Sequence, residues 1–546
     1  MKKLTLRVNA ADNIIVALSE LSKGTEVDVE GQSITLVENI PAKFKFAQQD
    51  FAKGDALIMY GVQIGVANEF IAKGAKITID NISHATEKAT IKDQFDYSWN
   101  PPLVNTEQYF QGYHREDGKV GTRNVWLVMP LVFCENRNIL AIQKALEPYL
   151  QPKKQHNEQL ASLIAQAKSG DVADQILSTE FALSDSAPDF VKPFENVDGV
   201  KYLTHHAGCG GTRADGERLC RLLVGYLMNP NVGGATILSL GCQNAQVSLF
   251  KEVLEQMAPG LNKPVYIHEQ QQSKSEKEFL AAAIKSTIAG LSKINKIQRK
   301  PAPVSDLVIG MECGGSDGFS GLSANPLLGR VADRIVALGG SAILAEFPEL
   351  NGVEQNIIDR CINKTDAESF QAMMKAYGDE AEAKGSGFAA NPSPGNIRDG
   401  LVTDAMKSAG AAKKGGEAPI VEVLDYTEQV TKKGLSLVCT PGNDVESTTA
   451  LVGSGATVVL FSTGLGTPTG NPATPVLKVS SNSEMSNRMQ DIIDFDAGTI
   501  ISGVDTLDTA ADRLLQQIIN VASGTAAKAE VLQQDDFIPW RRDLSL

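Results

Sequence analysis

Four of the seven cysteines stand where a predicted buried strand passes into a loop. Cys134 ends the run NVWLVMPLVFC, Cys242 ends ATILSLGC and Cys313 ends DLVIGMEC. Cys209 lies between glycines in HHAGCGG, and glycines allow a backbone to come close to a ligand. Ligands bind at the carboxyl ends of strands in open parallel sheets. We therefore predict that these thiols face a binding site, although a single cysteine near a strand end is also a common core filler.

Histidine and carboxylate side chains accompany the thiols. His205 stands four residues before Cys209, and Glu346 and Glu349 lie at the end of the predicted strand SAILAEFPEL. Thiolate, imidazole and carboxylate together form a donor set that can hold iron. The lack of CxxC spacing argues against a zinc ribbon or a ferredoxin-like run. The predicted metal ligands, which we expect to converge in one cleft, are His205, Cys209, Cys242 and Cys313.

Glycine-rich loops with basic residues offer a place for an anion. They are GYHREDGKVGTRN (112–124), NPSPGNIRDG (391–400) and KSAGAAKKGG (407–416), and TPGNDVESTT (440–449) adds further turn signals. Because guanidinium and ammonium groups suit a carboxylate, we expect some of the basic residues, Lys413 included, to clamp one. Polar residues that follow Cys313 in its loop complete the set. The predicted substrate-binding residues are Arg123, Ser316, Asp317, Arg398 and Lys414.

The elements that must position these residues predict an α/β protein. Residues 1–95 are typical of a small β-rich module with one helix at about 12–22, and the proline-containing segment 96–108 is typical of a linker. Residues 109–300 and 301–546 alternate apolar strands with helices, which predicts two α/β regions with mostly parallel sheets. Within them, the polar stretch 150–200 is expected to form a helical excursion or lid, and 296–307 a second join.

The bulk composition restricts the partners. The formal net charge is −14, which argues against a nucleic acid or an anionic membrane surface, because both need a basic footprint. No apolar run approaches the roughly 18 residues of a membrane span, and the first residues lack the apolar core of a signal peptide. We expect a cytoplasmic protein with reduced thiols that acts on a small molecule, with homo-oligomer formation left open.

Together, the motifs resemble one enzyme family. The runs FCEN, HHAGCGG, PNVGGATILSLGCQ, ECGGSDGFSGLSANPLLG, LAEFPEL and FSTGLGTPTGNP resemble the altronate/galactarate dehydratase family from about residue 109 to the C-terminus. The first 90 residues resemble the small SAF domain that often precedes it, through DNIIVAL, IPAKFKFA and YGVQIGVA. One position departs from that pattern, because Phe44 stands where relatives usually carry histidine. We therefore expect no imidazole metal ligand from the module, and solvated side chains for Lys43 and Lys45.

The resemblance implies a hydro-lyase that dehydrates a sugar acid to a 2-keto-3-deoxy acid. The expected reaction converts D-altronate to 2-dehydro-3-deoxy-D-gluconate and water in hexuronate catabolism, with galactarate dehydration or a sulfolactate-type C–S lyase as alternatives. Removing the proton next to a carboxylate creates a dianionic enediolate, which a divalent metal and a Lys or His base can accommodate. The resemblance implies Fe²⁺, with Mn²⁺ or a 4Fe–4S cluster as alternatives. The predicted catalytic residues are His205, Lys413 and Glu349.

A function of another class stays open at this point. The chain could be a non-catalytic sugar-acid-binding protein, in which the module and the cleft bind a ligand without turnover. The intact cysteine and histidine loops favour catalysis, whereas Phe44 in place of histidine favours binding alone.

Overall fold

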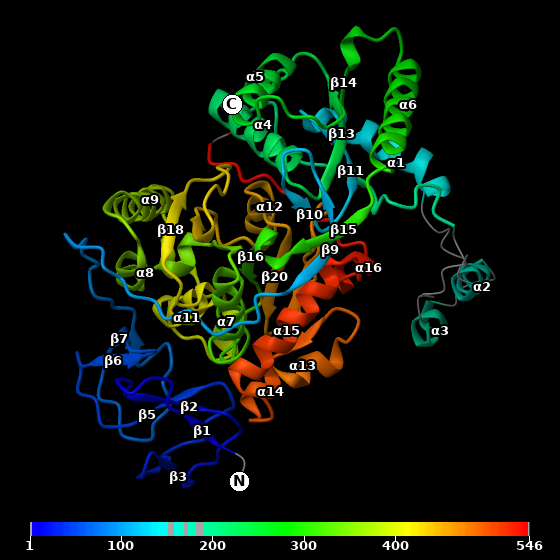
Figure 1. The fold of residues 1–546 in the computed structure, drawn as a ribbon. Helices are drawn as coiled ribbons and strands as arrows, with labels where there is room; N and C mark the ends of the chain where they lie inside the picture. Colours follow the sequence, from blue (N-terminus) through cyan, green and yellow to red (C-terminus); the bar gives the residue numbers. More distant parts are fainter. Residues whose placement is uncertain (1–2, 151–157, 169–172, 182–190, 544, 546) are drawn as a thin grey trace.

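The computed structural model describes residues 3–150, 158–168, 173–181, 191–543 and 545, and it contains three folded parts in chain order (Figure 1). The N-terminal module, blue in Figure 1, and the second domain lie at opposite ends, with the third domain between them. Residues 84–108 form neither helix nor strand and lie against the third domain, where the Tyr97 hydroxyl donates to the Glu417 carbonyl at 2.8 Å. Within the described ranges, every helix is too short or too polar to cross a lipid bilayer.

The N-terminal module consists of short antiparallel strands. One sheet has the order β1-β2-β5, β3 and β4 pair with each other, and another sheet has the order β6-β7-β8. The strands are β1 (Thr5–Leu6), β2 (Ile14–Ala17), β3 (Glu26–Val29), β4 (Gln32–Thr35), β5 (Lys45–Ala47), β6 (Ala56–Met59), β7 (Val62–Ala67) and β8 (Ile82–Ser83).

The helix predicted at residues 12–22 is wrong, because β2 occupies its centre. All four side chains of β2 are buried. Ile14 packs in a core that the module shares with the third domain, whereas Ile15 packs in a separate cluster within the module. Alternate side chains must therefore point to opposite sides, which is the two-residue period of a strand. Asp12 does not cap a helix but accepts N–H bonds from Asn9 and Gly61 and so ties two turns together.

The module is packed against the third domain through a continuous apolar core. Tyr60 belongs to the same buried cluster as Leu327 of the third domain. A Cβ atom at Gly321 would lie 2.4 Å from the Tyr60 hydroxyl oxygen, so this contact requires glycine. The Thr403 hydroxyl also donates to the Ile64 carbonyl at 3.0 Å. These contacts fix the module to the third domain.

The second domain contains a parallel sheet with helices on both faces. The sheet order is β12-β11-β13-β14. Helices α1 and α6 pack on one face and α4 and α5 on the other. The elements are β11 (Val125–Pro130), α1 (Asn136–Leu150), α2 (Glu158–Ala167), α3 (Ala173–Ser178), β12 (Gly199–Tyr202), α4 (Arg213–Met228), β13 (Val232–Ser239), α5 (Val247–Met257), β14 (Val265–Glu269) and α6 (Glu276–Ile294). The helical excursion predicted at 150–200 is present as α2 and α3, and its residues 151–157, 169–172 and 182–190 lie outside the described ones.

The join predicted at 296–307 contains a strand. Strand β15 (Arg299–Pro303) pairs with β9 (Tyr109–His114), which also pairs with β10 (Val120–Gly121), in the order β10-β9-β15. The two prolines of β15 are tolerated because β15 is an edge strand, where a missing N–H breaks no ladder.

The third domain is built on a seven-stranded parallel sheet. The order is β18-β19-β17-β16-β20-β21-β22. The strands are β16 (Val308–Cys313), β17 (Ser341–Leu344), β18 (Ile420–Leu424), β19 (Gly434–Val438), β20 (Val458–Thr463), β21 (Val476–Ser480) and β22 (Phe495–Asp496). The helices are α7 (Ala324–Ala337), α8 (Glu354–Arg360), α9 (Lys364–Ala383), α10 (Pro394–Arg398), α11 (Asp404–Ala411), α12 (Asp444–Gly453), α13 (Ser483–Arg488), α14 (Gly498–Ile501), α15 (Leu507–Ala522) and α16 (Lys528–Val531). The α/β prediction is confirmed.

The two faces of this sheet belong to different cores. Helices α7 and α15 pack with the face that carries Leu344 and Leu460, whereas α12 and α4 of the second domain pack with the face that carries Ile343 and Phe461. The sheet is therefore covered on both sides, and its strands deliver side chains to functional positions at their carboxyl ends.

Candidate functional site

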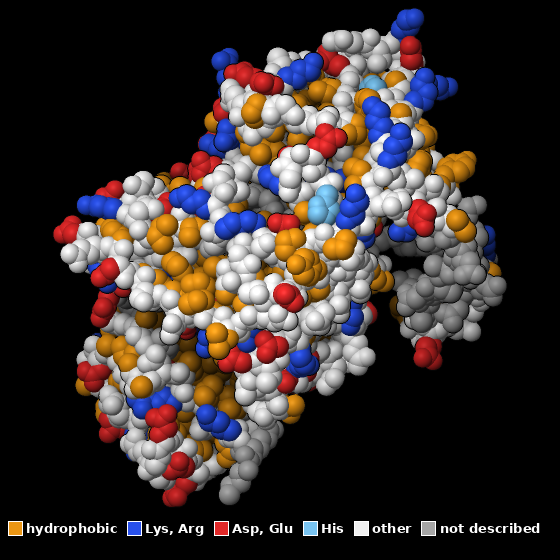
Figure 2. Space-filling model, viewed as in Figure 1, with side chains coloured by type: hydrophobic (Ala, Val, Ile, Leu, Met, Phe, Trp, Pro, Cys, Tyr) orange, Lys and Arg blue, Asp and Glu red, His pale blue; other side chains and the backbone are white. Residues whose placement is uncertain are grey.

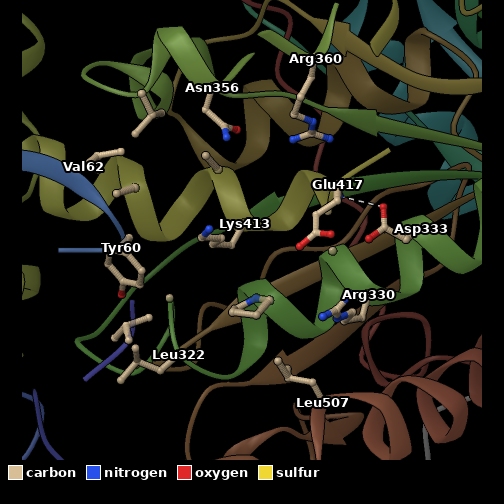
Figure 3. Close-up of a pocket in the computed structure, with 18 of the residues that line it drawn as sticks. Tyr60, Val62, Leu322, Arg330, Asp333, Asn356, Arg360, Lys413, Glu417 and Leu507 are labelled. Carbon is tan, nitrogen blue, oxygen red and sulfur yellow. Dashed lines mark hydrogen bonds between the residues drawn. The ribbon is translucent and has the colours of Figure 1, made fainter. Parts of the chain in front are cut away.

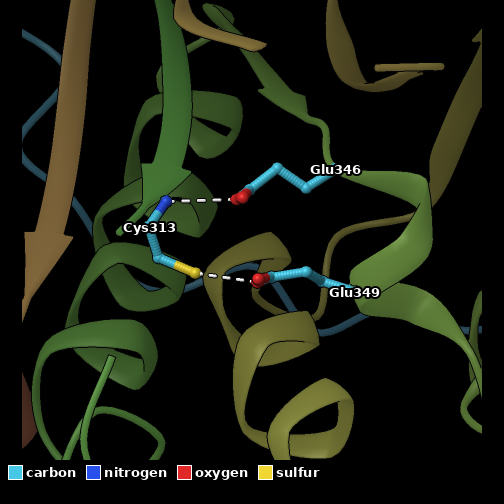
Figure 4. Close-up of side chains that lie close together, drawn as sticks. All are labelled: Cys313, Glu346 and Glu349. Carbon is cyan, nitrogen blue, oxygen red and sulfur yellow. Dashed lines mark hydrogen bonds between the residues drawn. The ribbon is translucent and has the colours of Figure 1, made fainter. Parts of the chain in front are cut away.

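A compact group of metal-ligating side chains lies at the carboxyl end of β16. Cys313 Sγ and one carboxylate oxygen from each of Glu346 and Glu349 lie within 4.8 Å of one another, and all three residues are buried (Figure 4). The Cys313 N–H donates to Glu346 at 3.1 Å, and its thiol donates to Glu349 at 3.0 Å. Both glutamates follow β17, the neighbour of β16 in the sheet. Two adjacent strands therefore bring the three side chains of this Cys313 cluster to one point.

Two lysines supply positive charge to the Cys313 cluster. Lys414 is 1% exposed, and its ammonium group contacts the Glu346 carboxylate and lies 2.8 Å from Cys313 Sγ. Lys407 of α11 pairs with Glu349 at 2.6 Å. Burial alone would lower the pKa of each ammonium group, but the surrounding carboxylates and thiol raise both pKa values above the ordinary lysine value. Both lysines are therefore protonated at neutral pH.

A third buried carboxylate gives the Cys313 cluster an excess of negative groups. Glu312 is 0% exposed and accepts a hydrogen bond from the Ser447 hydroxyl at 2.6 Å. Burial, and then the charge of Glu346, raises the pKa of Glu312 well above its ordinary value. Burial opposes ionisation of Glu349 too, but its two lysine neighbours lower its pKa to about 2. The cluster thus contains three carboxyl groups and two ammonium groups. One negative charge is therefore not neutralised by lysine, and a proton or a cation can neutralise it.

The residues of the Cys313 cluster fit a divalent metal ion. Thiolate and carboxylate donors together suit iron or manganese. One oxygen of Glu346 and one of Glu312 receive no hydrogen bond from an N–H or hydroxyl donor among the described residues, and the two carboxyl groups interact with each other, so they can share a proton or bind a cation. Glu346 also has a φ of 61°, a left-handed conformation that is uncommon outside glycine and is held mainly at functional sites. The three residues that would hold the ion are Cys313, Glu346 and Glu349.

The glycine-rich loops of the third domain each bring a polar side chain to this cluster. Asn391 donates to Glu349 at 3.4 Å, and the loop 407–416 carries both lysines. Asp444 begins α12 beside Gly314, where a Cβ atom would lie 2.0 Å from an Asp444 oxygen. Burial, and then the charges of the neighbouring glutamates, raises the pKa of Asp444 to about 7. Asp444 is only half-buried, so it is suited to exchange a proton near neutral pH.

His205 is not part of the Cys313 cluster, contrary to the prediction. The side chain is 3% exposed, with Nε2 2.9 Å from the Pro130 carbonyl oxygen and Nδ1 accepting the Ala207 N–H at 3.1 Å. Burial lowers the pKa of His205 to about 4, so the ring is neutral. Both ring nitrogens hold backbone in place, which corrects the assignment of His205 as a catalytic residue and as a metal ligand.

Arg123 also has a structural role in place of the predicted carboxylate clamp. Its guanidinium group binds both oxygens of Glu530 at 2.7 Å. The remaining donors reach three backbone carbonyls, those of Thr122, Val521 and Thr525, at 2.7–3.0 Å. A guanidinium group has five N–H donors, and here all five are used within the protein. Arg123 therefore joins the second domain to the end of the third.

Replacing Arg123 by lysine is expected to lower the free energy of unfolding by about 1–3 kcal/mol without changing KM. Lysine keeps the charge beside Glu530 but cannot reproduce the two parallel hydrogen bonds or reach the three carbonyls together. Denaturant unfolding and steady-state kinetics of the variant measure the two effects. A large rise in KM at unchanged stability would restore Arg123 to the substrate-binding set.

Lys413 and Arg398 lie outside the Cys313 cluster. Lys413 lines a cavity of about 630 Å³ together with Tyr60, Asp333 and Arg360 at the contact between the module and the third domain (Figure 3). In the tight 3₁₀ turn that carries both residues, Lys413 and Lys414 point about 120° apart. The catalytic assignment of Lys413 is therefore corrected. Arg398 is exposed at the end of α10, and its contact with substrate stays a prediction.

Ser316 and Asp317 shape the loop that follows Cys313. Asp317 is 0% exposed, and the Ser316 carbonyl accepts a hydrogen bond from Asn396 at 2.7 Å. The Asp317 carboxylate accepts hydrogen bonds at 2.8–3.1 Å from the side chains of Ser320, Ser481 and Asn482. Asp317 therefore has no free oxygen for a substrate, contrary to the prediction, and the role of Ser316 stays a prediction.

Lys43 and Lys45 of the N-terminal module are not solvated, contrary to the prediction. Lys43 pairs with Asp317 at 3.0 Å and with Asp399 at 3.1 Å. Lys45 is 1% exposed and donates to the Gly400 carbonyl at 2.7 Å, and burial lowers its pKa to about 7. The module thus contacts the loop beyond Cys313 through Lys43 and the loop 391–400 through Lys43 and Lys45.

Cys209 and Cys242 do not converge with Cys313, contrary to the prediction of one shared cleft. Both belong to the second domain, where Cys209 is half-buried and Cys242 exposed, whereas Cys313 is buried in the third. Among the described residues, the ligand atoms found within 4.8 Å of Cys313 Sγ are carboxylate oxygens. The thiols at strand ends are therefore divided between two sheets.

Three important groups were missed as site residues. Lys407 is the first residue of the loop 407–416, but the sequence does not show that its side chain points toward Glu349. Glu312 stands within the apolar run DLVIGMEC, and a carboxylate in a strand buried on both faces is a signal that could have been used. Asp444 stands in the loop 440–449 next to Asn443, whose side chain caps the helix, and the sequence did not distinguish their roles.

Comparison with known proteins agrees with this architecture. Family models match for the altronate/galactarate dehydratase SAF domain (residues 3–85), the D-galactarate dehydratase/altronate hydrolase second domain (112–295) and the D-galactarate/altronate dehydratase C-terminal domain (304–545). The chain is 33% identical over 537 residues to altronate dehydratase of Escherichia coli strain K12, which covers 97% of each chain. It is 32% identical to altronate dehydratase of Bacillus subtilis strain 168 (98% of this chain and 97% of the relative) and 30% identical to galactarate dehydratase (L-threo-forming) of E. coli strain K12 (95% and 92%). The chain therefore belongs to the galactarate/altronate dehydratase family.

Proposed function

We propose that this protein is a hydro-lyase that dehydrates a sugar acid, with D-altronate as substrate and 2-dehydro-3-deoxy-D-gluconate as product. The observation that carries the proposal is the Cys313 cluster, buried with Lys407 and Lys414 in a chain similar over its whole length to altronate dehydratases. Free thiols at seven positions are consistent with a cytoplasmic enzyme, where thiols stay reduced. On the face shown in Figure 2, acidic and basic side chains are mixed, which suits a small-molecule enzyme.

The charged groups of the cluster match the needs of this reaction. Removal of the proton beside the carboxylate places negative charge on the enediolate oxygens, and preorganised ammonium groups stabilise such charge. Lys407 and Lys414 are protonated and fixed, so they serve this purpose better than they would serve as bases. Asp444, with a pKa of about 7, is suited to move the proton at the substrate carbon or at the leaving hydroxyl.

A divalent ion, Fe²⁺ or Mn²⁺, would be held by Cys313, Glu346 and Glu349. The ion would supply further positive charge to the substrate carboxylate and its developing enediolate. The proposal is supported by the mixed sulfur and oxygen donors and by the adjacent carboxyl groups of Glu346 and Glu312, which can share a proton or bind a cation. Lys414 contacts the same atoms and offsets part of their charge.

A panel of hexonates and hexarates with Fe²⁺ or Mn²⁺, scored for 2-keto-3-deoxy acid, tests the proposed function. We expect turnover with D-altronate to exceed that with galactarate by at least about tenfold in kcat/KM, because the full-length identity is higher to the altronate enzymes. Sulfolactate in the same panel, scored for sulfite release, tests the C–S lyase alternative. Binding of a sugar acid without any product would instead support the non-catalytic function and overturn the proposal.

A further inference from the structure

Three thiols gather at one edge of the second domain, outside the Cys313 cluster. Cys134, Cys209 and Cys242 follow β11, β12 and β13, which are neighbours in the order β12-β11-β13. Neighbouring strands lie about 4.8 Å apart, and parallel strands end at the same edge of the sheet. The topology therefore places one cysteine on each of three adjacent loops.

Backbone contacts hold these three loops against one another. The Phe133 N–H donates to the Ala207 carbonyl at 3.0 Å, and the Asn244 N–H donates to the Gly208 carbonyl at 2.9 Å. Gly208 has a φ of 94°, and a Cβ atom there would lie 2.1 Å from the Leu131 carbonyl oxygen. Only glycine permits this approach. The middle loop, which carries the Cys209 thiol, is thus pressed against the loops on both sides of it.

The three thiols are open, unlike the other cysteines. Cys134 and Cys242 are exposed and Cys209 is half-buried, whereas the remaining four cysteines are buried. Free cysteine is among the most buried residue types, so three open thiols in one place are unusual.

The spacing of the thiols suits a cluster of several irons better than a single ion. Ligands of one tetrahedral ion lie roughly 3.7 Å apart, because metal–sulfur bonds are about 2.3 Å long. Among the described residues, the three thiols do not form a group with ligand atoms within 4.8 Å, although the Cys313 cluster does. An iron–sulfur cluster distributes its cysteine ligands over separate irons that sulfide bridges, so its thiolates stand farther apart.

We propose that Cys134, Cys209 and Cys242 bind a four-iron iron–sulfur cluster, with one iron left without a cysteine ligand. That iron would have an open position for an oxygen ligand. The cluster would lie at an open edge of the second domain, where the exposed thiols can be reached. The inference goes beyond the proposed function, and the presence of the cluster can be measured without turnover.

The test is anaerobic reconstitution of the full chain with iron, sulfide and a thiol reductant, followed by iron and acid-labile sulfide analysis and visible absorption. We expect about four irons and four sulfides per chain and a broad visible absorption band. Cys134→Ser, Cys209→Ser and Cys242→Ser should each lose most of the sulfide and the absorption. Cys220→Ala is the matched control, because Cys220 is buried in α4 of the same domain and should leave both unchanged.

Alkylation of the wild-type chain gives a second readout that needs no variant. Cys134, Cys209 and Cys242 should be protected in the reconstituted protein and modified in the metal-free protein, as mapped by peptide mass. Iron bound without sulfide, or sulfide retained in all three serine variants, would overturn the proposal. Loss of dehydration in protein that keeps its cluster would count against the proposed function alone, so the two failures are distinguishable.

Discussion

Replacement of Glu349 by glutamine is expected to lower kcat by about a thousandfold while the chain stays folded. Glutamine keeps the size of the side chain but has a single carbonyl oxygen, so it can accept a hydrogen bond from Lys407 or from Cys313 and not from both. The substitution removes the charge that Lys407 neutralises and one of the three ligand atoms of the Cys313 cluster. Affinity for Fe²⁺ or Mn²⁺ should therefore fall by at least about tenfold. Steady-state kinetics and calorimetric titration with each metal measure the two effects.

Glu422→Gln is the matched control for this experiment. Glu422 is also a buried carboxylate, but it lies on the edge strand β18 and accepts hydrogen bonds from the Thr431 and Ser436 hydroxyls. We expect the control to keep wild-type kcat and metal affinity. If Glu349→Gln behaved like the control, Glu349 would have no part in the chemistry, and the Cys313 cluster would be a structural ion network.

The α/β part of the fold is predictable from the sequence because its strands are buried on both faces. Val232–Ser239 and Val458–Thr463 are buried at every position. Helices such as Ala324–Ala337 separate these runs along the chain. A parallel sheet with helices on both faces buries such strands completely, so this pattern predicts that fold.

The small module is less predictable because its strands are short and serve two cores. Ile14–Ala17 has four buried side chains in a row, which a four-residue segment of either helix or strand could give. The choice is decided by contacts that are far away in sequence, such as the hydrogen bond from the Gly61 N–H to Asp12. Pattern alone therefore gave the wrong element there.

The sequence could not show which residues contact one another in the candidate site. These contacts depend on the direction of each side chain and on the sheet to which each strand belongs. Lys413 and Lys414 are adjacent and both basic, yet one lines a cavity and the other contacts Cys313. Cys209 and Cys313 both follow predicted strands, but the strands belong to different sheets. Strand-end position predicts that these residues lie at the carboxyl edges of sheets, but it does not predict which residues share an edge.

Replacement of Lys43 by methionine is expected to lower kcat by about 10- to 100-fold, although Lys43 belongs to the N-terminal module. Its ammonium group lies 3.0 Å from Asp317, which is 0% exposed. Removing Lys43 leaves the buried Asp317 carboxylate with its hydrogen bonds but without this cation, which costs about 1–3 kcal/mol. Asp317 lies four residues after Cys313. If the loop moves so that Asp317 reaches water, the Cys313 thiol is displaced with it. Kinetics and denaturant unfolding measure both consequences.

Two further variants separate charge from volume at this position. Lys43→Arg keeps a cation beside Asp317 and should recover part of the lost kcat, whereas Lys53→Met removes an exposed lysine of the same module and should change neither quantity. Equal kcat and stability in Lys43→Met and wild type would mean that the module acts only by covering apolar surface of the third domain. Partial recovery in the arginine variant alone would show that the module positions the Cys313 loop through a buried charge, which explains how it can serve the site without the histidine that Phe44 replaces.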